Sequence, residues 1–314
     1  MKELKPLLII KELTVTFHAN GDTIPAVTDF STSLDVGTCT AIIGESGCGK
    51  SVVAHAILRI LPETARVSGS FIYRERDLQT LSQDQMNAIR GKEIGIIFQS
   101  PDRALNPIYR IYRQIEEPLK THRVIPEENL KEHIYSTLAK VGFSHPIETS
   151  LLFPCNCSGG MNQRAVTAIV LSLLPELVIA DEPTKGLDGD RVSDVKSCLI
   201  EVKREGRTLL LITHDITLAR ELSEDLLVMY AGEIVESGKT KEILKEPMHP
   251  YTSGLLGSLP ENGFVPIPGF APSFANMPSG CRFRERCQHV TPKCHQNPAL
   301  VHNNGRMVRC HLYY

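Results

Sequence analysis

The sequence has almost no excess of charge of either sign. Its 314 residues include 34 Lys and Arg and 36 Asp and Glu, which gives a formal net charge of −2. Proteins that bind nucleic acids usually gather an excess of basic residues on one face. We therefore expect no nucleic acid among the partners of this chain.

Long apolar runs are also lacking. The longest, residues 165–180, is interrupted by Pro175 and Glu176, whereas a membrane-spanning helix needs about 20 apolar residues. The four apolar residues that precede Lys11 are too few for the apolar region of a secretory signal. We expect a chain without a signal peptide or a spanning helix, in a cytoplasm that keeps its nine cysteines reduced.

Apolar runs that alternate with amphipathic segments make up most of the chain, without internal repeats. This order predicts an α/β fold with helices covering a sheet. Helical periodicity replaces the strands from about 100 to 165, which predicts an inserted helical subdomain. Seven prolines in residues 246–280 predict a linker without regular structure. The runs typical of strands are LLII, CTAIIG, EIGIIF, ELVIAD, TLLLITHD and DLLVMYAGEIVESG.

A glycine-rich stretch, GESGCGKS, lies between the run CTAII and a helical segment. A strand, a glycine loop and a helix N-terminus in this order surround an anion with backbone N–H groups. Lys50 adds a positive charge for the outer phosphates, and the Ser51 hydroxyl can ligate Mg²⁺. The sequence therefore predicts a nucleotide-binding P-loop formed by Gly44, Glu45, Ser46, Gly47, Cys48, Gly49, Lys50 and Ser51.

Two carboxylates follow the apolar run LVIA. Asp181 and Glu182 would lie at the C-terminal edge of a strand, where α/β sheets bind their ligands. Asp181 would lie beside the metal, and Glu182 could polarise a water that attacks a phosphate. His214, which ends the run LLLITH, is suited to contact the γ-phosphate or that water.

A second candidate phosphate site is CSGGMNQR. Ser158, Gly159 and Gly160 precede a helix, so that a hydroxyl and exposed N–H groups would face outward. Two such sites in one chain imply either two ligands or one ligand shared between chains. Together with IIFQSP and VIADEPTKGLD, these stretches resemble the P-loop, Q-loop, signature, Walker B, D-loop and switch histidine of ATP-binding cassette (ABC) ATPases over residues 7–245.

This resemblance implies a P-loop NTPase (RecA-like) ABC cassette. It also implies two cassettes paired head to tail, so that ATP lies between one P-loop and the partner's signature. The implied roles are phosphate and Mg²⁺ binding for Gly44, Gly49, Lys50 and Ser51, metal sensing for Gln99, water-mediated Mg²⁺ binding for Asp181, the catalytic base for Glu182 and the switch for His214. The partner's nucleotide would contact Ser158, Gly159 and Gly160, Asp188 would link the two sites, and Phe17 would stack on adenine.

Three features depart from the family pattern. Cys157 replaces a common leucine, Asn162 replaces a commoner Arg or Gln, and TKGLD stands where TTALD is frequent. Because Ser158, both glycines and Asp188 remain, we expect function to persist. We expect slower turnover at the composite site that this signature completes.

The last part of the chain, from HPYTSGLLGSLP onward, resembles the C-terminal extension of ATPase subunits of oligopeptide, dipeptide and nickel importers. Four cysteines among basic residues, in a segment with few apolar residues, suit a metal centre that replaces a missing core. Zinc, or no metal, is the alternative from the residues alone. The resemblance implies a 4Fe-4S cluster held by Cys281, Cys287, Cys294 and Cys310.

The sequence thus predicts an ABC ATPase domain, residues 1–245, and a small irregular cysteine-rich extension, residues 246–314. By resemblance the chain powers import of peptides, on the cytoplasmic face of the membrane. Its expected partners are a second, different ATPase subunit, two permease chains and a solute-binding protein. The alternatives are an importer of nickel or metal chelates, a soluble ABC ATPase that does not transport, and a redox-sensing subunit with a degenerate ATP site.

Overall fold

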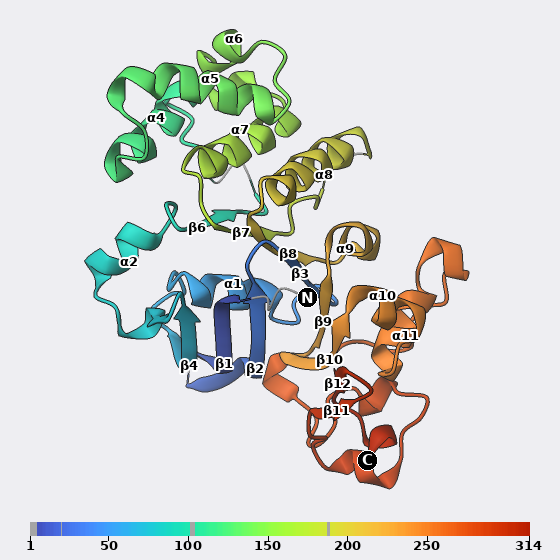
Figure 1. Cartoon of the computed structure of the whole chain (residues 1–314). Coiled ribbons are helices and arrows are strands. Elements are labelled where there is room, and N and C mark those ends of the chain that lie inside the picture. The colour runs from blue at the N-terminus through green and yellow to red at the C-terminus, as the bar shows by residue number, and fades with distance from the viewer. Residues whose placement is uncertain (1–4, 20, 101–103, 187–188) are drawn as a thin grey trace. The chain divides into compact units, whose positions relative to one another are not determined.

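A computed structural model describes residues 5–19, 21–100, 104–186 and 189–314 of the chain (Figure 1). The chain divides into two compact units. The first contains the N-terminal segment up to residue 35 with residues 39–80 and 211–314, and the second contains residues 36–38 and 81–210. The N-terminal and C-terminal parts of the sequence therefore fold together.

An antiparallel sheet in the first unit has the strand order β2-β1-β4-β5. Val15 of β1 lies opposite Val27 of β2 and Val67 of β4. Along β2 buried and exposed residues alternate over much of its length, as expected for a sheet with one face on the core and one on solvent. The bounds are β1 Pro6–Ala19, β2 Asp22–Asp35, β4 Ala65–Tyr73 and β5 Arg76–Asp77.

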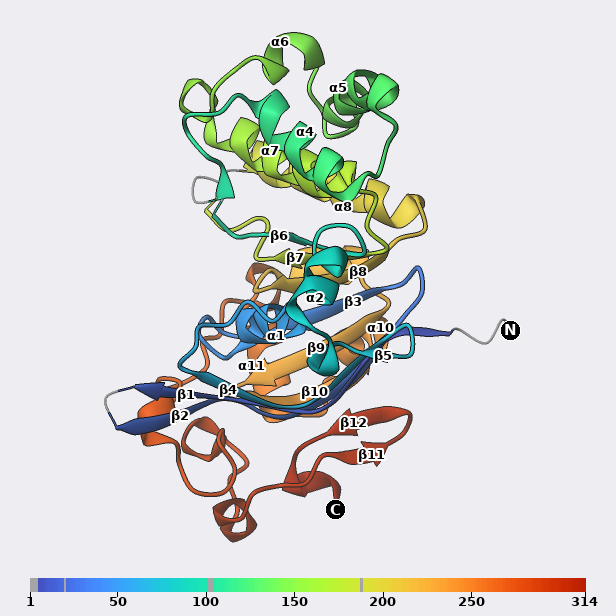
Figure 2. The ribbon, with the colours of Figure 1, turned by 90° about the vertical axis from the view of Figure 1, so that its left-hand side faces the viewer.

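Further strands of the first unit follow the order β11-β12-β10-β9-β3. β3 pairs in parallel with β9, whereas β10 is antiparallel to both β9 and β12. Every residue of β3 is buried, as in strands covered on both faces. The bounds are β3 Cys39–Ile43, β9 Asp225–Tyr230, β10 Glu233–Lys239, β11 Val301–Asn303 and β12 Arg306–Val308 (Figure 2), with helices α1 Lys50–Ile57, α9 Ile216–Leu222, α10 Thr240–Lys245 and α11 Pro250–Gly257.

The second unit combines a parallel strand pair with helices. β6 pairs with β7, and Ile111, Ile134 and Ala165 contribute to one buried apolar cluster of the helices α4, α5 and α7. β8 Thr208–Thr213, buried throughout, begins in this unit and ends in the first. The other bounds are α2 Gln83–Ile89, β6 Ile94–Ile97, α4 Ile111–His122, α5 Leu130–Lys140, α6 Pro146–Ser150, α7 Gly159–Ser172, β7 Leu177–Asp181 and α8 Gly189–Arg204.

Two predictions about regular structure were wrong. The run DLLVMYAGEIVESG is not one strand but two, because Ala231 and Gly232 adopt positive φ and turn the chain from β9 into β10. The segment after residue 245 is not devoid of regular structure. Pro250 occupies the first turn of α11, where its missing N–H is tolerated, and β11 and β12 form a hairpin on β10.

Candidate functional site

The predicted P-loop connects β3 to α1 in the first unit. Two of its glycines are required by close backbone approach and positive φ. A Cβ at Gly44 would lie 2.2 Å from the Met229 carbonyl oxygen, and one at Gly49, where φ is +104°, would lie 2.5 Å from that of Ala26. No side chain caps the N-terminus of α1 at Gly49 in the described structure, which suits a helix end that receives an anion.

Lys50 is buried at the start of α1. Its ammonium nitrogen lies 2.8 Å from the carbonyl oxygen of Gly44 and 3.0 Å from that of Glu45. The positive charge is therefore held by the loop that is predicted to receive phosphates. Ser51 is half-buried on the next position of α1. Burial raises the pKa of the Cys48 thiol.

Gln99, Asp181 and Glu182 belong to the second unit and lie at the ends of neighbouring parallel strands. Ile97 of β6 is level with Ala180 of β7, so that Gln99 and Glu182 come two residues beyond this level at the same sheet edge. Asp181 and Glu182 are both buried. Glu182 has φ of 49°, a left-handed conformation that is uncommon for a residue other than glycine. Such strain accumulates at functional sites.

The signature residues also belong to the second unit. Ser158 is the N-cap of α7, and its hydroxyl oxygen accepts a hydrogen bond of 3.3 Å from the Met161 N–H. Ser158 and Gly159 are exposed, whereas Gly160 is buried. The cap leaves a helix N-terminus at the surface, as predicted from the sequence. Asp188 lies outside the described residues.

Two further predicted residues, like the P-loop, belong to the first unit. His214 is exposed directly after β8. Phe17 is half-buried in β1, where it lies opposite Ile24 of β2 and Ala65 of β4. Its role as an adenine platform stays a prediction.

The four cysteines of the extension line one small cavity of about 10 Å³ with three histidines. Two of the four sulfurs accept a backbone N–H. The His289 N–H lies 3.4 Å from the Cys287 sulfur, and the Thr291 N–H lies 3.5 Å from that of Cys294.

The thiols of this cavity are free; Cys294 is buried, and Cys281, Cys287 and Cys310 are half-buried. Burial raises the pKa of Cys281 to about 11 and also raises the pKa of Cys287 and Cys310. They are therefore protonated at neutral pH, and a bound metal would have to displace protons. Among the described residues no three His, Cys, Asp or Glu side chains form a preformed site for a metal ion.

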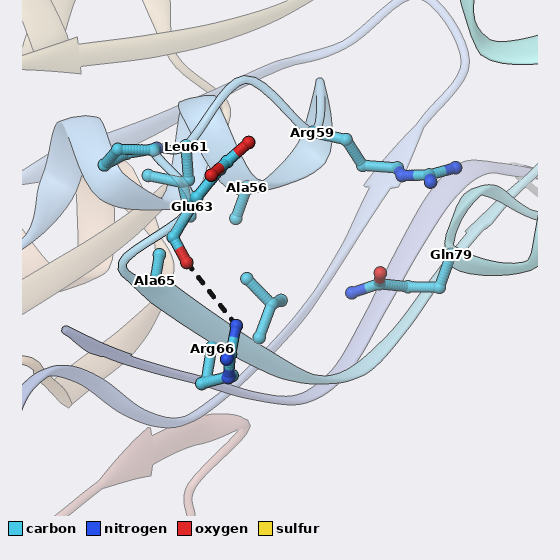
Figure 3. A pocket seen from close by; sticks show the side chains of 9 residues that line it. Ala56, Arg59, Leu61, Glu63, Ala65, Arg66 and Gln79 are labelled. Atoms are coloured by element: carbon cyan, nitrogen blue, oxygen red, sulfur yellow. Dashed lines mark hydrogen bonds between the residues drawn. The ribbon is translucent and has the colours of Figure 1, made fainter. Parts of the chain in front are cut away.

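A cavity of about 640 Å³ in the first unit contains none of the predicted site residues (Figure 3). It lies where α1 ends and β4 begins. Arg59 donates to the Leu78 carbonyl at 3.0 Å, and Arg66 donates to the Glu63 carbonyl at 3.4 Å. We assign no nucleotide to it.

Contacts between the extension and the P-loop were not predicted. The Glu45 carboxylate is bound by Arg286, and the Glu45 N–H donates to the Tyr251 hydroxyl at 2.9 Å. No local pattern reveals them, because more than 200 positions separate each pair of residues.

Within the described ranges no helix is both long and apolar enough to span a bilayer.

Comparison with known proteins locates two family matches. Residues 27–185 match the ABC transporter model, and residues 235–294 match the oligopeptide/dipeptide transporter C-terminal region. A dipeptide transport ATP-binding protein of Haemophilus influenzae is 39% identical over 97% of this chain and 95% of its own length. An oligopeptide transport ATP-binding protein of the same organism is 35% identical over 98% of both chains.

Solved structures give the same fold. A dimeric ATP-binding cassette in a post-hydrolysis state with ADP and Pi is 25% identical, covers 74% of this chain and 98% of its own, and has a TM-score of 0.67. The CbiO1 protein of Clostridium perfringens, part of an ABC transporter complex, is 28% identical over 77% of this chain and 91% of its own, with a TM-score of 0.65. The α/β P-loop cassette fold is therefore confirmed, and the chain belongs to the ABC transporter ATP-binding proteins of the oligopeptide/dipeptide family.

Proposed function

We propose that this chain is the ATP-hydrolysing subunit of an importer for peptides. The observation that carries the proposal is the joint match of the cassette and of the oligopeptide/dipeptide C-terminal region. The peptide-transport names of the relatives support the same cargo class. Nickel complexes are the alternative cargo.

Uptake by intact cells tests the cargo. Cells lacking this chain should lose accumulation of labelled di- or oligopeptides and regain it when the chain is supplied. Loss of nickel uptake with unchanged peptide uptake would establish the alternative. Unchanged uptake of both would contradict a transport role.

The residues suggest a hydrolysis mechanism at the P-loop. We infer that N–H groups of residues 44–51 and the Lys50 ammonium bind the ATP phosphates, and that Ser51 and Asp181 bind Mg²⁺, with Gln99 beside it. A water oxygen then bonds to the γ-phosphorus while the bond to the ADP oxygen breaks. Glu182 accepts the proton of that water, and His214 contacts the γ-phosphate.

A second cassette completes the site in this proposal. Ser158, Gly159 and Gly160 would bind the partner's nucleotide through the N-terminus of α7, and Asp188 would link the two sites. The dimeric cassette with ADP and Pi supports such pairing. We propose a different ATPase subunit as the partner, two permeases and a solute-binding protein in the complex, and a peripheral position on the cytoplasmic face of the membrane.

We propose further that residues 246–314 form a metal-binding extension of the ABC domain, residues 1–245. Four thiols around one cavity, two of which accept backbone N–H groups at their sulfurs, suit a 4Fe-4S cluster, because such hydrogen bonds stabilise cluster ligands. A single zinc ion, with Zn–S bonds of about 2.3 Å, is the alternative for four cysteine ligands. The resemblance to the peptide-importer subunits favours the cluster over zinc.

Metal content tests this proposal. Protein purified without oxygen should contain about four iron and four sulfide per chain, and Cys287→Ser should lose most of both. Cys155→Ser, which changes an exposed cysteine of the second unit, should retain them. Colourless wild-type protein containing zinc alone would contradict the cluster.

A further inference from the structure

The extension binds the side chain of Glu45 in the P-loop through an arginine. The Arg286 guanidinium donates two hydrogen bonds, of 2.9 and 3.0 Å, to the two carboxylate oxygens of Glu45. The Arg286 side chain is only 6% exposed, and its Nε also donates to the Pro268 carbonyl at 3.0 Å. Bidentate arginine–carboxylate pairs are among the stronger and more directional polar contacts in proteins.

Arg282 is connected to the P-loop backbone at Cys48 through the turn between β9 and β10. It donates to the Ala231 carbonyl, and it pairs with Glu233 at 3.4 Å. The next residue of that turn, Gly232, donates its N–H to the Cys48 carbonyl at 2.9 Å. The turn between β9 and β10 therefore connects Arg282 to the P-loop backbone.

An aromatic side chain lies between these two arginines. Phe283 is buried and packs against Tyr230 and Tyr251, with ring centroids 5.2 and 5.5 Å away. The Tyr251 hydroxyl is the group that accepts the Glu45 N–H. Burial raises the pKa of Tyr251, so that this hydroxyl stays neutral. Both the backbone and the side chain of Glu45 are thus held by residues that follow position 245.

Arg282, Phe283 and Arg286 all belong to one short segment, Cys281–Cys287, which we call the arginine loop. Its two end residues contribute their sulfurs to the cysteine cavity. Its Arg282, Phe283 and Arg286 form the contacts described above. The arginine loop therefore connects the cysteine cavity, at its two ends, to the contacts that Arg282, Phe283 and Arg286 make between them.

We propose that the arginine loop regulates nucleotide affinity, with Arg286 as a positioning residue that neutralises Glu45 when the four cysteines are held together. The coupling to the cysteines rests on the metal-binding function proposed above. A Glu45 carboxylate without its arginine is a negative charge in the loop that must receive phosphates, so its exposure weakens ATP binding. By linkage, bound nucleotide then stabilises the loop and shields its cysteines.

Nucleotide titration of the purified full-length chain tests the role of Arg286. The probe is the Mg²⁺ complex of a non-hydrolysable ATP analogue. Arg286→Gln should raise its Kd about tenfold, and Arg286→Lys, which keeps the charge but not the bidentate geometry, about threefold. The double variant Glu45→Gln/Arg286→Gln should return to within about threefold of wild type, because no unpaired carboxylate remains.

A matched control lies in the same loop. Arg284 hydrogen-bonds to Ser279 within the extension, so Arg284→Gln should leave Kd unchanged. An unchanged Kd in Arg286→Gln, or a double variant as weak as the single one, would overturn the role of Arg286. Should Arg286→Gln fail to fold, the other two variants still test the role of Arg286. A raised Kd in Arg286→Lys together with a Kd near that of the wild type in Glu45→Gln/Arg286→Gln is expected only if Arg286 acts by neutralising Glu45.

Thiol reactivity tests the link between the cysteines and the nucleotide. A saturating concentration of the Mg²⁺ complex of the ATP analogue should slow alkylation of Cys281 and Cys287 by N-ethylmaleimide several-fold in the wild type. Mass spectrometry of the peptides measures the alkylation of each cysteine. In Arg286→Gln at saturating analogue this protection should disappear. Equal protection in both proteins would overturn the link. If the chain bound zinc, only the cluster proposal would fail. If it bound no metal, the coupling to the cysteines would fail as well, whereas the Kd of Arg286→Gln would still decide the role of Arg286.

Discussion

Replacing Glu182 by Gln is expected to slow ATP hydrolysis by about two to four orders of magnitude while Mg-ATP binding is preserved. Glutamine keeps the size of the side chain and one oxygen but cannot accept the proton of the attacking water. Glu182 is 5% exposed and has left-handed backbone geometry. The substitution therefore removes the base with little change in shape. Phosphate release and nucleotide titration of the same preparation, with its partner subunits present, measure the two effects separately.

Glu148→Gln is the matched control for this experiment. Glu148 belongs to the same unit, and its exposed side chain lies 3.4 Å from His145. This variant should hydrolyse ATP at the wild-type rate. Unimpaired hydrolysis in Glu182→Gln would remove Glu182 from the role of base, and loss of binding in that variant would show that the substitution disrupts the site itself.

The parts of the fold that the sequence predicts well are encoded by consecutive residues. The P-loop is recognisable because an apolar run is followed by a glycine-rich stretch and Lys50. The strand β7 is recognisable because a short apolar run ends in the carboxylates Asp181 and Glu182. β2 and β4 were missed because polar residues interrupt their apolar ones. β2 includes Thr28, Ser31 and Ser33 between buried positions, as a strand does when one of its faces is in water.

The contacts of the extension could not be predicted from local patterns. Arg286 and Glu45 are 241 positions apart, and an arginine between two cysteines is otherwise read as a solvated residue. The pairing arises because residues after 210 fold into the same unit as the P-loop. The prolines were equally misleading. Their spacing leaves room for α11 between Pro250 and Pro260, and the sequence alone does not reveal that Pro250 starts a helix.

The largest stability effect is expected from Glu236→Ala, which removes a carboxylate that is completely buried in β10. One carboxylate oxygen accepts the Met248 N–H and the other accepts the His249 N–H, both at 2.9 Å. The Arg306 guanidinium of β12 lies 3.7 Å away and is also shielded from water. Alanine would leave two buried N–H donors without their acceptor and a buried positive charge without its carboxylate. Breaking such a pair from one side costs about 3–5 kcal/mol.

Thermal and urea unfolding of the full-length chain measure this loss, and proteolysis shows where it acts. Because Glu236 joins β10 to the start of α11 and to β12, we expect the variant to be cleaved first after residue 245. Glu261→Ala removes one partner of an exposed pair with Arg220, 3.3 Å apart, and should change the free energy of unfolding by less than about 1 kcal/mol. Equal stability of the two variants would contradict the view that the extension is fixed to the cassette by a buried ion pair. A destabilised Glu236→Ala whose cleavage begins in the helices α4–α7 would show that the lost energy belongs to another part of the chain.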